Sequence, residues 1–210
     1  METVAVFSAL TTIGLFVFAV SGALTALRND LDLFSVSVMA FVTGVGGGTI
    51  RDVLLGQFPV WWIADPGAVL ICLAGAATAV IAQPIITSRL SALIWADAMG
   101  LSVFAVLGAQ AALEAESPAI IAIFMGTVTA AFGGIVRDVL LNEPSLLLRQ
   151  EIYATAALTG AAVYVGAVYL GLGDGASAIT AALTTFVIRA AAILFNIQLP
   201  KFSRPRKDEL

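Results

Sequence analysis

Two short motifs in this sequence combine consecutive glycines with an arginine followed directly by an aspartate. The first motif reads GGGTIRDVLLG and contains Gly46, Gly47, Gly48, Arg51 and Asp52. The second motif reads FGGIVRDVLL and contains Gly133, Gly134, Arg137 and Asp138. Two further charged residues, Asp97 and Arg189, also lie within apolar stretches. Guanidinium and carboxylate groups in such surroundings form ion pairs with each other or contact a polar solute.

The glycines of both motifs are expected to interrupt helices. Each glycine in a helix interior costs roughly 1 kcal/mol relative to alanine, so consecutive glycines favour an unwound segment. Irregular backbone within a bilayer is stable only where it faces protein or a water-filled cavity. The glycine breaks therefore predict a polar interior. The alternative is that the glycines only allow two helices to approach closely.

The partners of the buried charges follow from helix geometry. Adjacent residues on a helix point about 100° apart, so Arg51 is not expected to pair with Asp52. Arg51 is expected to pair with Asp97 or Asp138, and Asp52 with Arg137 or Arg189. Ion pairs that only hold helices together are the structural alternative. Both readings place these residues inside the bundle.

The composition excludes several classes of protein. There is no histidine and only one cysteine, so a histidine-containing catalytic triad, the common zinc sites and an intrachain disulfide are excluded. Hydrophobic residues make up 60% of the chain and charged residues only 11%. We therefore expect a membrane protein that is not an enzyme and needs no cofactor. The net charge of -4 and the absence of a basic face argue against binding to nucleic acid.

The charged motifs must be positioned by transmembrane helices. A bilayer core of ~30 Å requires about 20 mostly apolar residues in a helix. Seven stretches satisfy this requirement: 4–27, 33–56, 66–86, 90–113, 118–141, 152–171 and 176–197. The prediction is an all-α membrane protein forming one transmembrane domain over residues 1–210, with a cytoplasmic tail at 198–210.

An internal repeat organises these spans. Residues 12–55 align without a gap onto residues 98–141, an offset of 86, and 20 of the 44 aligned positions are identical. Repeat 1 covers residues 4–86, repeat 2 covers residues 90–171, and the helix at 176–197 has no counterpart. Each repeat holds three spans, so the second copy must enter the membrane from the opposite side. Inverted repeats are typical of proteins that move small solutes near the bilayer midplane.

The positions of basic residues predict the orientation. Arg28, Arg89, Arg149 and the basic residues of the tail fall on one side of the membrane, whereas the opposite joints contain no Lys or Arg. Positive residues in short loops favour the cytoplasm, so the N-terminus is expected outside and the C-terminus inside. Near the span ends, Trp61, Trp62 and Tyr153 are interpreted as interfacial anchors.

The paired glycine and Arg-Asp motifs resemble those of the bacterial and archaeal branch of the trimeric intracellular cation (TRIC) channel family, over nearly the whole chain. The resemblance implies a homotrimer in which each subunit has its own pore, gated near the glycine motifs of spans 2 and 5. It also implies that monovalent cations, chiefly potassium with some sodium, permeate this pore. A domain of the same family is described as a glycine transporter in bacteria.

Three interpretations of the function follow from these observations. The first is a potassium-permeable channel in the prokaryotic inner membrane, surrounded by membrane lipids. The alternative is a secondary transporter of glycine or another small zwitterion, because an arginine suits a carboxylate and an aspartate suits an ammonium group. The candidate pore or gate residues are the nine motif residues together with Asp97 and Arg189. A structural protein without transport is the third possibility.

Overall fold

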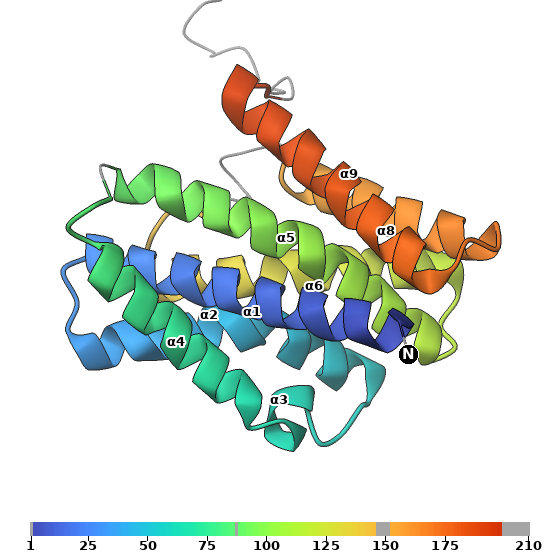
Figure 1. Cartoon of the computed structure of the whole chain (residues 1–210), viewed down its shortest axis with the longest axis horizontal. Coiled ribbons are helices and arrows are strands. Elements are labelled where there is room, and N and C mark those ends of the chain that lie inside the picture. The colour runs from blue at the N-terminus through green and yellow to red at the C-terminus, as the bar shows by residue number, and fades with distance from the viewer. Residues whose placement is uncertain (1, 87, 146–151, 199–210) are drawn as a thin grey trace, which may run out of the picture.

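The computed structural model describes residues 2–86, 88–145 and 152–198 (Figure 1). Within these residues the secondary structure is entirely helical. The helices are α1 (Glu2–Arg28), α2 (Leu33–Leu55), α3 (Trp61–Ala64), α4 (Gly67–Ala82), α5 (Arg89–Glu114), α6 (Ala119–Leu140), α8 (Ala154–Tyr169) and α9 (Asp174–Phe195). The predicted all-α class is confirmed. Most of the predicted tail and Arg149 lie outside the described residues.

Seven of these helices coincide with the seven predicted spans. Five of them, α1, α2, α5, α6 and α9, are long and apolar enough to cross a membrane. The other two, α4 and α8, are apolar but have only 16 residues each. Helix α3 has four residues and was not predicted, because it lies in a joint where no helical period can develop.

The ends of α2 show how the sequence begins and ends its helices. Asp32 is the N-cap, and its Oδ1 accepts a hydrogen bond from the backbone N–H of Ser35 at 2.7 Å. This bond lowers the pKa of the Asp32 carboxyl below its usual value. Gly56 ends the helix in the left-handed conformation, with φ of 67°. Glycine adopts this conformation without the steric cost that a Cβ adds, which explains the residue at this turn.

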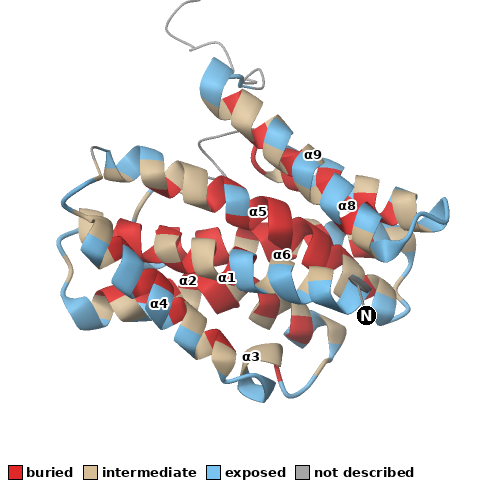
Figure 2. Cartoon of the chain, viewed as in Figure 1, coloured by how far each residue is buried: buried red, intermediate tan, exposed pale blue. Residues whose placement is uncertain are grey.

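Helix α5 lies at the centre of the bundle. It packs against α1, α6, α8 and α9, and of the five long helices it buries the largest share of its residues. Figure 2 shows this buried surface running along α5 and the facing sides of α1 and α6. The two largest contacts between the repeats join α1 to α5 and α2 to α6.

The prediction that the glycines interrupt the second and fifth spans is wrong for this structure. Helix α2 is continuous through Gly46, Gly47 and Gly48, and α6 is continuous through Gly133 and Gly134. A side chain on Gly47 would overlap the carbonyl oxygen of Thr129 in α6. The glycines therefore serve close approach of two helices, which offsets their low helix propensity.

The contact between α2 and α6 is reciprocal. A Cβ on Gly133 would overlap the carbonyl oxygen of Thr43, just as one on Gly47 would overlap that of Thr129. Gly47 and Gly133 are 86 residues apart, the offset of the repeat, and so are Thr43 and Thr129. Gly47 in α2 lies against Thr129 in α6. Thr43, which comes four residues earlier in α2, lies against Gly133, which comes four residues later in α6. The two helices therefore cross antiparallel.

The contact between α1 and α5 is reciprocal in the same way. Phe18 and Phe104, which are also 86 residues apart, stack on each other with ring centroids 5.2 Å apart. A Cβ on Gly14 would lie 3.2 Å from the Phe104 ring, and one on Gly100 would meet the Phe18 ring. Residues that contact their own equivalents are characteristic of a two-fold arrangement.

Candidate functional site

The charged residues of the two motifs form separate clusters on either side of the α2–α6 crossing. Arg51 follows Gly47 by four residues in α2, and Arg137 follows Gly133 by four residues in α6. Since the glycines meet at the crossing and the helices are antiparallel, the two arginines lie on opposite sides of it. The chain thus has two polar centres separated by a tightly packed contact.

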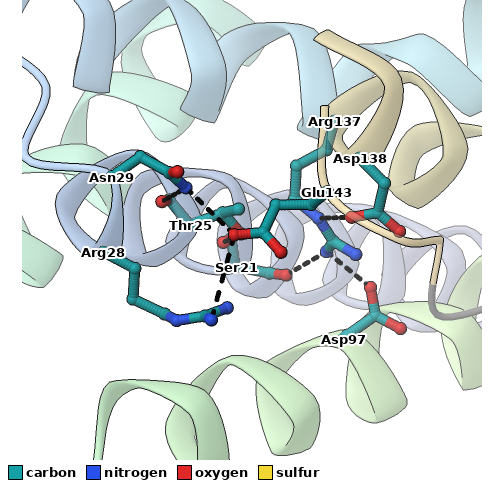
Figure 3. A network of polar contacts seen from close by, with 8 residues as sticks. All are labelled: Ser21, Thr25, Arg28, Asn29, Asp97, Arg137, Asp138 and Glu143. Atoms are coloured by element: carbon teal, nitrogen blue, oxygen red, sulfur yellow. Dashed lines mark hydrogen bonds and ion pairs between the residues drawn. The ribbon is translucent and has the colours of Figure 1, made fainter. Parts of the chain in front are cut away.

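The first cluster surrounds Arg137, whose side chain is fully buried (Figure 3). Its Nη1 is 2.7 Å from Oδ1 of Asp97 in α5, and its Nε donates to Oδ1 of Asp138 at 2.8 Å. Nη1 also donates to the hydroxyl of Ser21 in α1. One guanidinium therefore joins α1, α5 and α6. Charge-assisted hydrogen bonds of this kind offset part of the large cost of burying ions.

Arg189 and Tyr153 extend this cluster to α8 and α9. The Arg189 guanidinium carbon lies 5.1 Å from the centroid of the Tyr153 ring, a cation–π distance. Tyr153 directly precedes α8 and is only 1% exposed. The interpretation of Tyr153 as an interfacial anchor is therefore wrong, because its ring lies inside the bundle next to the charges.

The second cluster contains Arg51 and Asp52. Nε and Nη2 of Arg51 lie 2.8 and 2.7 Å from Oδ1 of Asp52, and Oδ2 accepts a hydrogen bond from the backbone N–H of Trp61 at 2.8 Å. The expected pairings of Arg51 with Asp97 or Asp138, and of Asp52 with Arg137 or Arg189, are therefore wrong. The long arginine side chain curves back to its neighbour, and both motifs form this adjacent pair.

Trp61 and Trp62 attach α3 to the second half of α2. The indole of Trp61 covers Gly48, where a Cβ would lie 3.0 Å from its Cδ1. The indole N–H of Trp62 donates to the hydroxyl of Thr49 at 3.0 Å, and its ring packs edge-on against Phe41. Both tryptophans are partly buried, so they fix the joint after α2 rather than serving only as interfacial anchors.

A cavity of about 250 Å³ reaches Arg51 from one end of the bundle. Its lining includes Thr11, Gln57, Trp61, Gln110 and Glu114. Thr11 occupies the position that corresponds, at the offset of 86, to Asp97. Arg51 therefore faces a polar cavity. Its equivalent, Arg137, is instead enclosed by an additional carboxylate, that of Asp97. The two centres differ in exposure although their motifs are alike, since the Arg51 side chain is 12% exposed and that of Arg137 is fully buried.

Polar contacts also join the two repeats at the other end of the bundle. Nη2 of Arg28 lies 3.9 Å from Oε1 of Glu143, and Nδ2 of Asn29 donates to the same oxygen at 3.4 Å (Figure 3). Nη1 of Arg89 donates to the carbonyl oxygen of Leu27 at 2.8 Å. Arg28 and Arg89 thus lie at the same end, beyond the Arg137 cluster.

The structure brings together some of the predicted site residues and separates others. Asp97, Arg137, Asp138 and Arg189 gather around Tyr153 and Ser21, and Arg51 and Asp52 stay apart from them. Ser21 was not predicted from the sequence. Its signal is a break in the repeat, because the equivalent residue in an otherwise well-matched stretch is Leu107.

The fold and these buried charges define a membrane protein with several transmembrane helices and a polar interior. A family model described as "Glycine transporter" matches residues 8–84 and 94–169. The chain therefore belongs to this family, and its relation to the TRIC channels, inferred from the motifs, is confirmed by solved structures.

Two bacterial relatives match most of this chain. A UPF0126 membrane protein of Vibrio cholerae is 40% identical over 195 residues, which cover 90% of this chain and 80% of the relative. The UPF0126 inner membrane protein YadS of Escherichia coli K12 is 38% identical over 199 residues, which cover 92% of this chain and 95% of the relative.

Two solved structures share the fold. The TRIC channel orthologue of Rhodobacter sphaeroides, described as a trimeric intracellular cation channel, has a TM-score of 0.88 and 44% identity. The match covers 91% of this chain and 99% of that one. A prokaryotic TRIC channel crystallised in 0.5 M KCl has a TM-score of 0.87 and 30% identity, covering 95% of this chain and 100% of that one.

Proposed function

We propose that this protein is a cation channel of the TRIC type, permeable to potassium and, to a smaller extent, sodium. The observation that carries the proposal is the fully buried Arg137 cluster in a fold that matches TRIC cation channels over more than nine-tenths of the chain. Ionised groups inside a membrane usually mark an ion or solute pathway.

The pathway runs from the cavity at Arg51, through the α2–α6 crossing, to the Arg137 cluster. Water enters the first part, because Arg51, Gln57 and Gln110 line an open cavity. Beyond the crossing, Arg137 and its carboxylates occupy the route. In this conformation the pathway is closed there, and opening requires α6 to move relative to α5. The motif glycines, from Gly46 to Gly48 and at Gly133 and Gly134, remain the proposed gate region.

The architecture proposed for this function has seven crossing helices. The 16 residues of α4 and α8 span about 24 Å, so the turns that flank them complete the crossing of a ~30 Å core. The reciprocal contacts support two repeats inverted about an axis in the membrane plane. Three such subunits form a homotrimer in the bacterial inner membrane, each with its own pathway, with the N-terminus outside.

The charges of the interior are compatible with cation passage. Three arginines, Arg51, Arg137 and Arg189, are matched in number by three aspartates, Asp52, Asp97 and Asp138. A neutralised interior does not repel cations strongly, and the ion pairs can exchange partners as an ion passes. Ordered carbonyl groups at a helix end can add negative potential.

A planar bilayer experiment tests the proposed function. Purified protein under a potassium chloride gradient is expected to show discrete openings whose currents reverse near the potassium potential. Replacing Arg51 by glutamine is expected to change the unitary conductance, whereas Arg28→Gln, outside the pathway, leaves it unchanged. Silent bilayers, together with accumulation of labelled glycine in liposomes of the same preparation, would contradict the channel and indicate the transporter.

A further inference from the structure

The two polar centres of the bundle differ by two charged residues. Each centre contains the arginine and the aspartate of its own motif, but the centre around Arg137 also contains Asp97 of α5 and Arg189 of α9, both fully buried. The residue of the first repeat that corresponds to Asp97 is Thr11, and α9 has no counterpart in either repeat. The two additional charges have opposite signs, so together they leave the net charge of the centre unchanged.

Asp97 uses only one of its two carboxylate oxygens in this conformation. Oδ1 lies 2.7 Å from Nη1 of Arg137 (Figure 3). Oδ2 is buried and has no hydrogen-bond partner among the residues that the structure describes. A buried carboxylate oxygen without a donor costs free energy. Asp97 can therefore accept a second cationic partner in addition to, or in place of, Arg137.

Arg189 is the second cation beside Asp97, and the Tyr153 side chain lies next to both. The guanidinium carbon of Arg189 lies 5.1 Å from the centroid of the Tyr153 ring. The hydroxyl of the same ring adjoins Asp97, because a Cβ on Gly134 would lie 3.1 Å from this hydroxyl and 3.3 Å from Oδ1 of Asp97. The charges of Arg189 and Asp97 are close enough to attract each other.

The two arginines near Asp97 come from helices that pack differently. Arg137 lies in α6, and the proposed opening moves α6 relative to α5. Arg189 lies in α9, whose main contacts are with α5 and α8. Movement of α6 therefore separates Arg137 from Asp97 but leaves Arg189 beside it. A buried carboxylate that loses its only counter-ion is strongly unfavourable, so the open state requires another cation at this position.

We propose that Asp97 exchanges Arg137 for Arg189 when α6 moves, so that the seventh helix supplies the counter-ion that stabilises the open channel. This inference rests on the proposed channel function. Arg189 acts through Asp97 and determines the equilibrium between the closed and open states. The centre at Arg51 needs no such exchange, because Thr11 there replaces the carboxylate.

A double-mutant cycle tests the exchange. In potassium chloride bilayers, Arg189→Gln is expected to lower the open probability by about tenfold, within the usual range of couplings in a two-state equilibrium. Arg189→Lys, which retains the charge, is expected to preserve most of the open probability. In the Asp97→Asn background, Arg189→Gln is expected to have no effect, because no charge then needs compensation. The control Arg28→Gln removes the same charge at the partly exposed end and is expected to leave the open probability unchanged.

Two results of this cycle would overturn the inference. One is an unchanged open probability in Arg189→Gln. The other is an equal loss with and without the Asp97 carboxylate, which would show that Arg189 acts only by packing against Tyr153. A purely structural role predicts this second result, so the cycle distinguishes the two roles of Arg189.

A second measurement does not depend on conduction. A crystal structure of Arg137→Gln is expected to show the Asp97 carboxylate within ion-pair distance of Arg189, whereas in Arg137→Lys the carboxylate is expected to stay with the substituted side chain. An Asp97 carboxylate that contacts no atom of Arg189 in Arg137→Gln would contradict the exchange. Silence of the unsubstituted protein in bilayers would instead count against the proposed channel, and the crystal structure would still decide whether Asp97 changes partner.

Discussion

At the residue scale, the most costly feature of this protein is the burial of Arg137. Its guanidinium holds Asp97 and Asp138 at 2.7 and 2.8 Å, and the side chains of Arg137 and Asp97 have no exposed surface. A buried pair is not in itself a large source of stability, because desolvation opposes the Coulomb attraction. Removing one partner, however, leaves a charge without compensation in an apolar interior.

We therefore expect Arg137→Gln to destabilise the protein by about 3–5 kcal/mol, the range for breaking a buried ion pair. Thermal unfolding in detergent measures this loss. The control is Arg28→Gln, because Arg28 lies 3.9 Å from Glu143 at the partly exposed end and should contribute no more than about 1 kcal/mol. The double variant Arg137→Gln, Asp97→Asn should regain part of the loss. Equal stability of the two single variants would contradict this account.

At the element scale, the α2–α6 crossing determines how close the two repeats can come. Gly47 and Gly133 each face a carbonyl oxygen of the opposite helix with no room for a side chain. Intrinsic helix propensity favours alanine over glycine by roughly 1 kcal/mol in a helix interior, so propensity alone would place alanine at these two positions. Tertiary packing outweighs propensity at both positions.

Gly47→Ala is accordingly expected to destabilise the protein by about 1–3 kcal/mol, as overpacking does, despite the better helix former. Gly166→Ala in α8 is the matched control, because a Cβ there would meet no atom within 4 Å. The control should be as stable as the unsubstituted protein or slightly more so. The same thermal measurement in detergent compares the two variants, and a neutral Gly47→Ala would show that the crossing is looser than described.

Particular residues show how far the sequence predicts this structure. Hydropathy located the five long helices and the two shorter apolar ones, α4 and α8, because the apolar length of each is a property of its own segment. The glycine motifs were assigned correctly to helices but wrongly to breaks, because the effect of Gly47 depends on Thr129 in another helix. Tyr153 and Ser21 were missed for a similar reason, since their burial beside Arg137 depends on the packing of α1, α5, α6 and α9. The adjacent Arg51–Asp52 pair was rejected because average helix angles do not describe a flexible arginine side chain.

At the scale of the whole molecule, the two ends of the bundle differ in where their basic residues lie. Arg28 and Arg89 lie at one end, together with Asp30, Asp32 and Glu143, whereas the described joints and helix ends toward the other end hold the exposed carboxylates of Asp65, Glu114, Glu116 and Asp174 and no Lys or Arg. Glu114 and Asp174 border polar cavities at this acidic end. Basic residues favour the cytoplasmic side, so the cavity that leads to Arg51 is expected to open outside the cell.

Cysteine labelling tests this orientation. The chain has one cysteine, Cys72, which is buried, so Cys72→Ala provides a clean background. In intact cells, an impermeant maleimide is expected to label Ala115→Cys at the acidic end but to label Asn29→Cys only after the membrane is permeabilised. The opposite pattern would reverse the orientation, and equal labelling in intact cells would contradict the placement of the two ends across the membrane.

The reciprocal packing of the two repeats also constrains how this sequence can change. Gly47 packs against Thr129, and Gly133 packs against Thr43. The two halves of the chain therefore contact each other through equivalent residues. A larger side chain in one half is therefore tolerated only if the residue that it contacts in the opposite half makes room for it. Variation at the contacting positions, Gly47 with Thr129 and Gly133 with Thr43, should be correlated, as in two copies of one gene segment that must continue to fit each other after they have diverged.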